Sequence, residues 1–234
     1  TVYIPQYYDQ AYRLEEARAV VPAASFTGYD FSLGVATILA RYDRTPDRGI
    51  PGVRGRPADV SRDTTYGDPR DYIDDTTQSL RSKLAYELND SWQLRHTLGV
   101  FKLDSDFDNT YLTGYDAKTN TVGRQRWQQD LTTRNVFNNV ELEGGFNTFG
   151  LEHRLLTGIE LGSQRRDPKL STSTAVKDGG KAVPSLDLKH PNRHLSHTGP
   201  MFVSSNNHTE VESQGLYVQD QIKYGRWVGL FGLR

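Results

Sequence analysis

The chain contains no cysteine, which excludes a disulfide framework, a zinc–thiolate site and a cysteine nucleophile. It also lacks any run of about 18 apolar residues, so a helical membrane span is excluded. The net charge is −1 and the basic residues are scattered, so nucleic acid is not expected as a partner. No signal peptide opens the chain, and an exported protein would therefore be the mature form or a fragment.

The clearest pattern that is present runs from Thr77 to Leu103 and predicts a β-hairpin. Side chains with period two belong to a strand, because successive Cβ atoms point to opposite faces. One face of the first strand carries Leu80, Ser82, Leu84, Tyr86 and Leu88; one face of the second carries Trp92, Leu94, His96, Leu98 and Val100. The short polar residues 89–91 favour a tight turn between the two strands. The hairpin is therefore long and apolar on one face, with charged residues on the other.

Two further hairpins repeat this design, with turns expected at 147–148 and 224–226. Long connections rich in Pro, Gly, Asn and charged residues separate the hairpins, at 43–75, 104–128 and 162–212. Tight turns thus alternate with long loops, which is typical of bacterial outer-membrane barrels with short periplasmic turns and long extracellular loops. A mean hydropathy of −0.67 does not oppose this, since only alternate strand residues meet lipid.

The sequence therefore predicts an all-β fold, an antiparallel transmembrane β-barrel. Residues 31–42 give the first clear strand and begin the expected barrel domain, 31–234. Residues 1–30 are an unassigned lead-in, in which 12–21 is compatible with a short helix that ends near Pro22. Seven strands result, and bacterial single-chain barrels have an even number, so we expect the chain to be part of a larger barrel.

Four stretches also resemble the TonB-dependent siderophore receptors: 44–57, 79–112, 153–167 and 215–234. LYVQDQI and the terminal GLR are the most specific elements of the resemblance, which covers 33–234. The resemblance implies a barrel of about 22 strands that an N-terminal plug closes. It also implies import of a ferric siderophore across the outer membrane of a Gram-negative bacterium, with energy delivered by the TonB complex through the plug. The plug is not recognisable in this sequence.

A ferric siderophore is bound as an intact chelate and transported, so no permanently bound cofactor or metal is expected. Aromatic faces and cationic groups suit such a ligand. The candidate ligand-binding residues lie in or beside the long connections: Tyr66, Tyr72, Phe107, Tyr111, Tyr115, Arg124, Arg126, Trp127, Arg165 and Arg166. The alternative for each is ordinary: aromatic residues in the interfacial girdle, and arginines that contact lipopolysaccharide or solvent.

Other motifs are weaker. Asp104, Asp106 and Asp108 start like a calcium loop, but Asn109 and Tyr115 stand where an EF-hand needs Gly and Glu. His190, His194 and His197 lack a suitably spaced carboxylate, so exposed loop histidines are the simpler reading. No G-x-S-x-G, HExxH or phosphate-binding glycine loop is present, and an enzyme is not expected.

Two alternatives to the siderophore receptor remain open at this point. One is a passive porin or adhesin barrel in the outer membrane. The other is a soluble β-sheet binding module.

Overall fold

The computed structural model describes residues 2–3, 12–20, 23–28, 30–46, 48–173, 183–193 and 200–234. Among these residues, no helix is long and apolar enough to cross a membrane. The fold is built from antiparallel strands: β1 (Val2–Tyr3), β2 (Tyr12–Val20), β3 (Ala23–Thr27), β4 (Phe31–Pro46), β5 (Ile50–Val53), β6 (Arg56–Pro57), β7 (Tyr72–Asn89), β8 (Trp92–Asp116), β9 (Thr121–Thr148), β10 (Leu151–Thr172), β11 (Leu186–Asp187), β12 (Phe202–Asn206), β13 (Thr209–Tyr224) and β14 (Trp227–Leu233).

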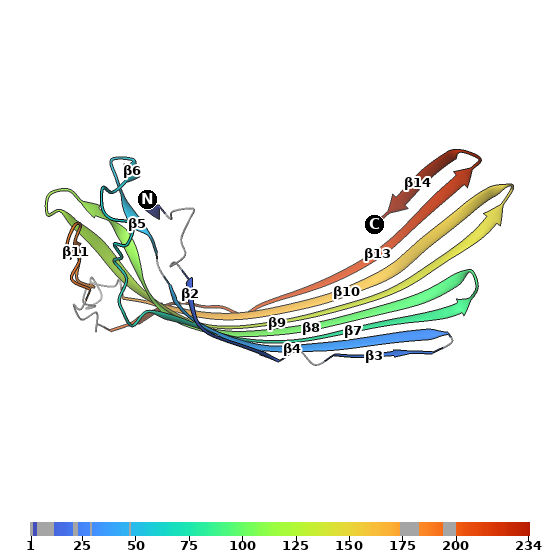
Figure 1. Cartoon of the computed structure of the whole chain (residues 1–234), viewed down its shortest axis with the longest axis horizontal. Coiled ribbons are helices and arrows are strands. Elements are labelled where there is room, and N and C mark those ends of the chain that lie inside the picture. The colour runs from blue at the N-terminus through green and yellow to red at the C-terminus, as the bar shows by residue number, and fades with distance from the viewer. Residues whose placement is uncertain are drawn as a thin grey trace.

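One large curved sheet dominates the molecule, with strand order β14-β13-β10-β9-β8-β7-β4-β2 (Figure 1). β3 extends the same edge, since it also pairs with β4. β2 corrects the expectation of a helix: its residues pair with β4 in the register Ala17 to Tyr42. Pairing with a long neighbouring strand overrides the helix propensity of the Leu-Glu-Glu-Ala-Arg segment. The described path therefore holds eight strands, not the seven that the sequence pattern gave.

The two faces of this sheet differ in polarity, as the alternation predicts. Cross-strand partners share a face, so the register defines rows of side chains across the sheet. One row of the apolar face is Leu33, Leu84, His96, Val140, Ile159 and Leu216. The neighbouring row on the polar face is Gly34, Lys83, Thr97, Asn139, Glu160 and Gly215.

The apolar face is exposed rather than packed into a core. Val140, Ile159 and Leu216 are all exposed, Leu216 to 70%. A soluble protein does not leave a continuous apolar face of this size open to water. The polar face carries ion pairs instead, among them Arg95 Nη1 to Glu143 Oε2 at 2.9 Å. This division fits lipid on one side and water on the other.

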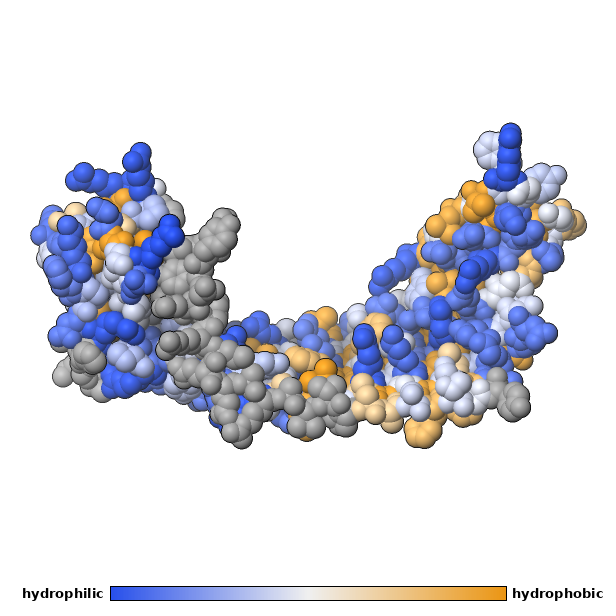
Figure 2. All heavy atoms as spheres, viewed as in Figure 1, coloured by the Kyte–Doolittle hydropathy of each residue, from blue (hydrophilic) through white to orange (hydrophobic). Residues whose placement is uncertain are grey.

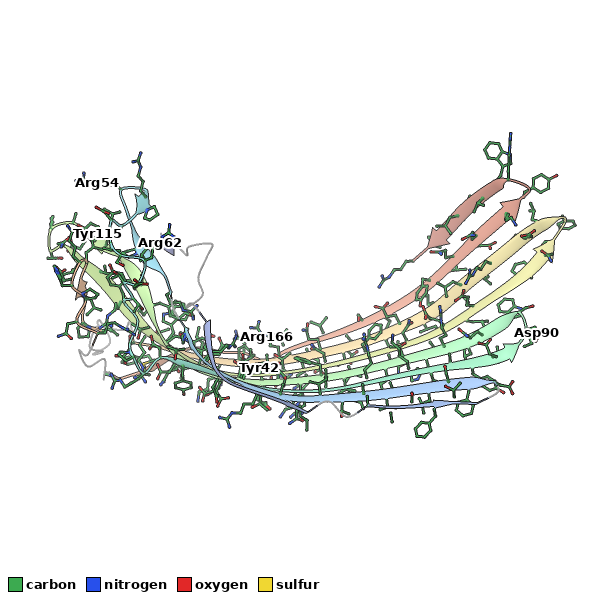
Figure 3. All side chains as sticks on the ribbon, in the orientation of Figure 1. Tyr42, Arg54, Arg62, Asp90, Tyr115 and Arg166 are labelled. Carbon is green, nitrogen blue, oxygen red and sulfur yellow. The ribbon has the colours of Figure 1, made fainter. Side chains whose placement is uncertain are left out.

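The turns of the β7–β8, β9–β10 and β13–β14 hairpins lie at one end of the sheet, the end where Figure 3 labels Asp90. The β7–β8 turn is at the predicted place, and its Ser91 amide donates to Asn89 Oδ1 at 2.9 Å. The β13–β14 turn is also where it was predicted, with Gly225 at φ 56°. The β9–β10 turn is wrong by two residues: it lies at Phe149 and Gly150, whose φ angles of 50° and 82° suit a two-residue hairpin loop.

The predicted connection 104–128 is also corrected, because most of it is strand. β8 has 25 residues and β9 has 28, and they stay paired as far as Asp116 and Thr121. A membrane crossing needs only about 9–11 residues per strand. The β8–β9 hairpin therefore projects far beyond the apolar band.

Candidate functional site

The long connections pack together at the end of the sheet opposite the tight turns. We call this region the cap, and it consists of residues 48–71, 108–128 and 183–193. The small sheet β1-β5-β6 belongs to the same end (Figure 1). A buried apolar cluster forms its interior, from Ile50, Ala58, Tyr66, Val122, Leu186 and Leu188. Figure 2 shows hydrophobic atoms in the middle of this end, ringed by hydrophilic ones. The first and third connections are therefore folded structure in their described parts.

Tyr66 is the centre of the cap. Its side chain is fully buried, and its hydroxyl donates to the Leu188 carbonyl oxygen at 2.6 Å. Burial, with a smaller effect of Asp187, raises the pKa of Tyr66 to about 12. The hydroxyl therefore stays protonated at neutral pH and acts as a donor that ties two distant connections together.

Arg124 is buried beside Tyr66 and serves the same interior. Its Nε donates to the Pro184 carbonyl at 2.8 Å and one terminal nitrogen to the Tyr66 carbonyl at 3.3 Å. Burial lowers the pKa of this guanidinium. Both side chains, predicted as ligand contacts, thus lie inside the cap.

Arg126 and Asp108 form a two-pronged ion pair across the β8–β9 hairpin. Arg126 Nε donates to Asp108 Oδ1 at 2.6 Å, and its terminal nitrogen donates to the second oxygen. Gln128 donates to the same carboxylate at 2.8 Å. The hydrogen bond to Asp108 is the main cause that raises the pKa of Arg126. This pair stiffens the hairpin, since bidentate geometry fixes both partners.

Asp71 holds the end of the first connection against β8. Its carboxylate accepts from the Thr110 amide at 3.0 Å, the Thr110 hydroxyl at 2.9 Å and the Asp68 amide at 3.0 Å. Burial raises the pKa of Asp71 to about 6, even though these hydrogen bonds act in the opposite direction. The group is therefore a cap contact that titrates near neutral pH.

A different arrangement lies on the other face of the hairpin, where Tyr111 and Trp127 meet. Their ring centroids are 5.3 Å apart, tilted by 43°. The guanidinium carbon of Arg48 lies 4.0 Å from the Tyr111 ring centroid, and its terminal nitrogen donates to the Tyr111 hydroxyl at 2.7 Å. All three side chains are partly accessible. We call this group the Arg48 cluster.

Sequence reasoning singled out both aromatic residues of the cluster but missed Arg48. No local signal marks Arg48, because its partner Tyr111 is 63 positions away. The sequence analysis placed Arg48 only within the long connection 43–75.

The remaining predicted residues are spread around the sheet. Phe107 pairs with Ile73 and Gln129, on the face that also carries Tyr111. Tyr72 donates to Asp106 Oδ1 at 3.3 Å at the start of β7. Tyr115 follows a bulge, packs against the apolar cluster of the cap, and donates to Asn120 Oδ1 at 3.1 Å. Figure 3 labels Tyr115 together with Arg54 and Arg62 at this end.

Arg165 and Arg166 point to opposite faces of β10, because they are consecutive in a strand. Arg165 shares the apolar face, is half exposed, and lies 3.4 Å from Asp167. Arg166 shares the polar face with Thr133 and is exposed. The two arginines therefore do not act on one ligand.

Among the described residues, no group of three His, Asp or Glu side chains is arranged to hold a metal ion. Asp104, Asp106 and Asp108 occupy consecutive outward positions of strand β8, not a loop. His190 is highly exposed, 3.7 Å from Asp187. His194 and His197 lie outside the described residues.

The comparisons with known proteins address the fold and the family. The family model "TonB dependent receptor-like, beta-barrel" matches residues 22–234. The chain belongs to this family of TonB-dependent receptors. Its members are transporters of the Gram-negative outer membrane, which confirms the predicted location and a role other than catalysis.

Relatives of this receptor chain include the metal-pseudopaline receptor CntO of Pseudomonas aeruginosa, strain UCBPP-PA14. It is 26% identical over 214 residues, which are 88% of this chain and 28% of CntO. The catecholate siderophore receptor Fiu of Escherichia coli K12 is 23% identical over 225 residues, 84% of this chain and 29% of Fiu. The receptor chain thus spans less than a third of the length of these relatives.

Solved structures give the same fold. The siderophore receptor PiuA from Acinetobacter baumannii superposes with a TM-score of 0.79 at 20% identity, over 92% of this chain and 34% of PiuA. The closed form of the E. coli K12 import receptor Fiu gives 0.74 at 20% identity, over 90% of this chain and 32% of Fiu. The all-β fold of these receptor barrels is therefore confirmed, and because such barrels are apolar outside and polar inside, the polar face of the sheet corresponds to the lumen side.

Proposed function

We propose that this chain is the barrel segment of a receptor that binds a ferric siderophore through its extracellular cap and imports it with TonB-coupled energy. The Arg48 cluster is the observation that carries the proposal. Two aromatic rings on a stiff hairpin beyond the membrane lie within contact of the Arg48 guanidinium, which comes from the first connection, and all three side chains are partly accessible. Such a group suits an oxygen-rich chelate, whose flat apolar parts stack on rings and whose oxygens accept hydrogen bonds.

We assign different roles to the ten residues predicted from sequence. Tyr111 and Trp127 contact the chelate together with Arg48, and Phe107 and Arg166 extend the same face. Tyr66, Arg124 and Arg126 hold the cap in shape. Tyr72, Tyr115 and Arg165 are peripheral, and Arg165 on the apolar side contacts outer-membrane lipid or lipopolysaccharide.

The names of the relatives support a metal chelate as the ligand class. CntO is named for metal-pseudopaline and Fiu for catecholate siderophores. We infer that the ferric chelate is transported cargo rather than a resident cofactor, and that contact with the TonB complex is made through a plug domain that the described residues do not include. We also place the start of the barrel segment near residue 12, because β2 pairs with β4.

The test is a binding measurement on the intact receptor that carries this chain. We expect Arg48→Ala and the double change Tyr111→Ala with Trp127→Ala each to raise the Kd for a ferric tricatecholate about tenfold or more, since buried aromatic and arginine contacts dominate interfaces. Trp227→Ala is the matched control, because Trp227 is an exposed tryptophan at the opposite end of the sheet.

Unchanged affinity in both cluster variants would overturn the assignment of these contacts. A wild-type receptor with ohmic conductance and no tight ferric ligand would instead support a passive porin.

A further inference from the structure

Two cations on the polar face of β7 stand out because they have no counter-ion among the described residues. Arg81 and Lys83 are both exposed, and neither makes an ion pair or hydrogen bond with another described residue. Several other cations of that face are paired. Arg95 and Arg154 pair with Glu143 at 2.9 Å and 2.6 Å, and Arg234 pairs with Glu160 at 3.2 Å. Arg81 and Lys83 therefore leave fixed positive charge free on the described part of this face.

The neighbours of these two cations are small, which leaves room in front of them. Arg81 lies between Ala36 and Gly99, and Lys83 lies between Gly34 and Thr97. Beyond Gly34 and Ala36 the row ends in Ser25 and Ala23 of β3. A hollow of about 340 Å³ lies here, lined by Arg81, Lys83 and small residues of β3 and β4. Pockets for small ligands begin at about 300 Å³.

The position of the hollow is on the route from the cap to the periplasmic turns. Arg81 lies four residues along β7 from Thr77, whose row includes Arg166, and Lys83 lies two residues further. At about 3.3 Å per residue, the pair is roughly 13–20 Å below that row. Arg166 is itself exposed on the same face. Arg166, Arg81 and Lys83 therefore lie one after another from the cap toward the turns, and the paired Arg95 lies next in that direction.

We propose that Arg81 and Lys83 form an inner subsite of the lumen wall that holds a negatively charged chelate after it leaves the cap. The inference rests on the proposed function and narrows its substrate class to anionic oxygen chelates. Iron(III) tricatecholates are trianions and trihydroxamates are neutral. A pocket lined by one sign of charge raises the local concentration of the opposite sign, and a neutral chelate gains nothing from it. The unpaired cations therefore favour catecholate-type or carboxylate-type chelates.

Another occupant is an acidic side chain of the domain that fills the lumen. The small size of the neighbouring residues favours a ligand, because glycine, alanine, serine and threonine beside the two cations form a hollow of ligand size. The experiment is designed to separate the two occupants.

The experiment uses the intact receptor and two probes, a ferric tricatecholate and a ferric trihydroxamate. We expect the charge-removing pair Arg81→Gln with Lys83→Gln to lower the maximal rate of tricatecholate uptake about tenfold or more, while the Kd at the cap changes less than about twofold. The charge-preserving pair Arg81→Lys with Lys83→Arg should retain the rate. Arg134→Gln is the matched control, an exposed arginine on the opposite face of β9.

Uptake of tricatecholate at the wild-type rate in the glutamine pair would overturn the inference, while tight binding in the same assay leaves the proposed function intact. Equal slowing of both probes, with a lowered Tm, would assign the cations to a protein carboxylate instead. A wild-type receptor that binds neither probe would overturn the proposed function and the inference with it. If the glutamine pair fails to assemble, Lys83→Gln alone must show the same loss of uptake, and a wild-type rate in it overturns the inference.

Discussion

Replacing Tyr66 by phenylalanine removes one hydroxyl group from the interior of the cap. The Leu188 carbonyl that accepts its hydrogen bond at 2.6 Å is itself in a buried residue, so the acceptor has no water to replace the lost donor. Leaving a buried acceptor unpaired costs about 1–3 kcal/mol. The opening equilibrium of the cap should therefore rise about 5- to 150-fold.

Hydrogen exchange at the Leu188 amide measures this opening directly. That amide donates to the Asn120 carbonyl at 3.1 Å, which joins the third connection to the tip of the β8–β9 hairpin. Its protection reports local opening, because a paired amide exchanges only when the pair separates. Tyr72→Phe is the control, since the Tyr72 hydroxyl bonds the exposed Asp106 side chain outside the cap. Equal protection in Tyr66→Phe and wild type would refute the view that Tyr66 holds the cap closed.

Three further outcomes are expected. The pKa of Asp71 is raised in the folded state to about 6, so docking of its loop is strongest below about pH 4 and weakens as the pH rises through 6. The change in docking free energy is of order 2–3 kcal/mol. Hydrogen exchange at the Thr110 amide should follow this pH dependence, and the same pH profile in Asp71→Asn would contradict it. Arg126→Ala leaves the buried Asp108 carboxylate without its cation and should destabilise the hairpin by about 3–5 kcal/mol, seen as faster proteolysis near 117–120; a wild-type cleavage rate would argue against this role. On the sheet itself, Ile159→Arg should lower the free energy of unfolding by about 2–4 kcal/mol in a titration in lipid vesicles, and Asn139→Arg should lower it far less. Equal losses would mean that the two faces do not meet lipid and water respectively.

The sequence predicts those parts of the fold whose faces meet different solvents. Leu84 and Leu94 alternate with charged residues because one side of the sheet meets lipid. This alternation involves neighbouring residues, so it can be recognised in the sequence. Beyond the apolar band this asymmetry ends. The segment around Asp104 and Thr132 then looks like loop, although the backbone ladder continues through it.

The cap is harder to predict for a related reason. Tyr66 and Leu188 are 122 positions apart, and neither segment contains a local sequence pattern that predicts contact with the other. The predicted set of aromatic and arginine residues therefore mixes side chains that fill the cap with those that face outward. Only the three-dimensional arrangement separates Tyr66 and Arg124 from Tyr111 and Trp127.

The uninterrupted ladder of β8 and β9 has a practical consequence for experiments on living cells. At about 3.3 Å per residue, strands of 25 and 28 residues reach roughly 80–90 Å, far more than the thickness of a bilayer. Their turn at 117–120 is thus held in a fixed position above the lipid headgroups. A fluorophore or an antibody epitope placed there would report cap movements without disturbing the membrane-embedded wall.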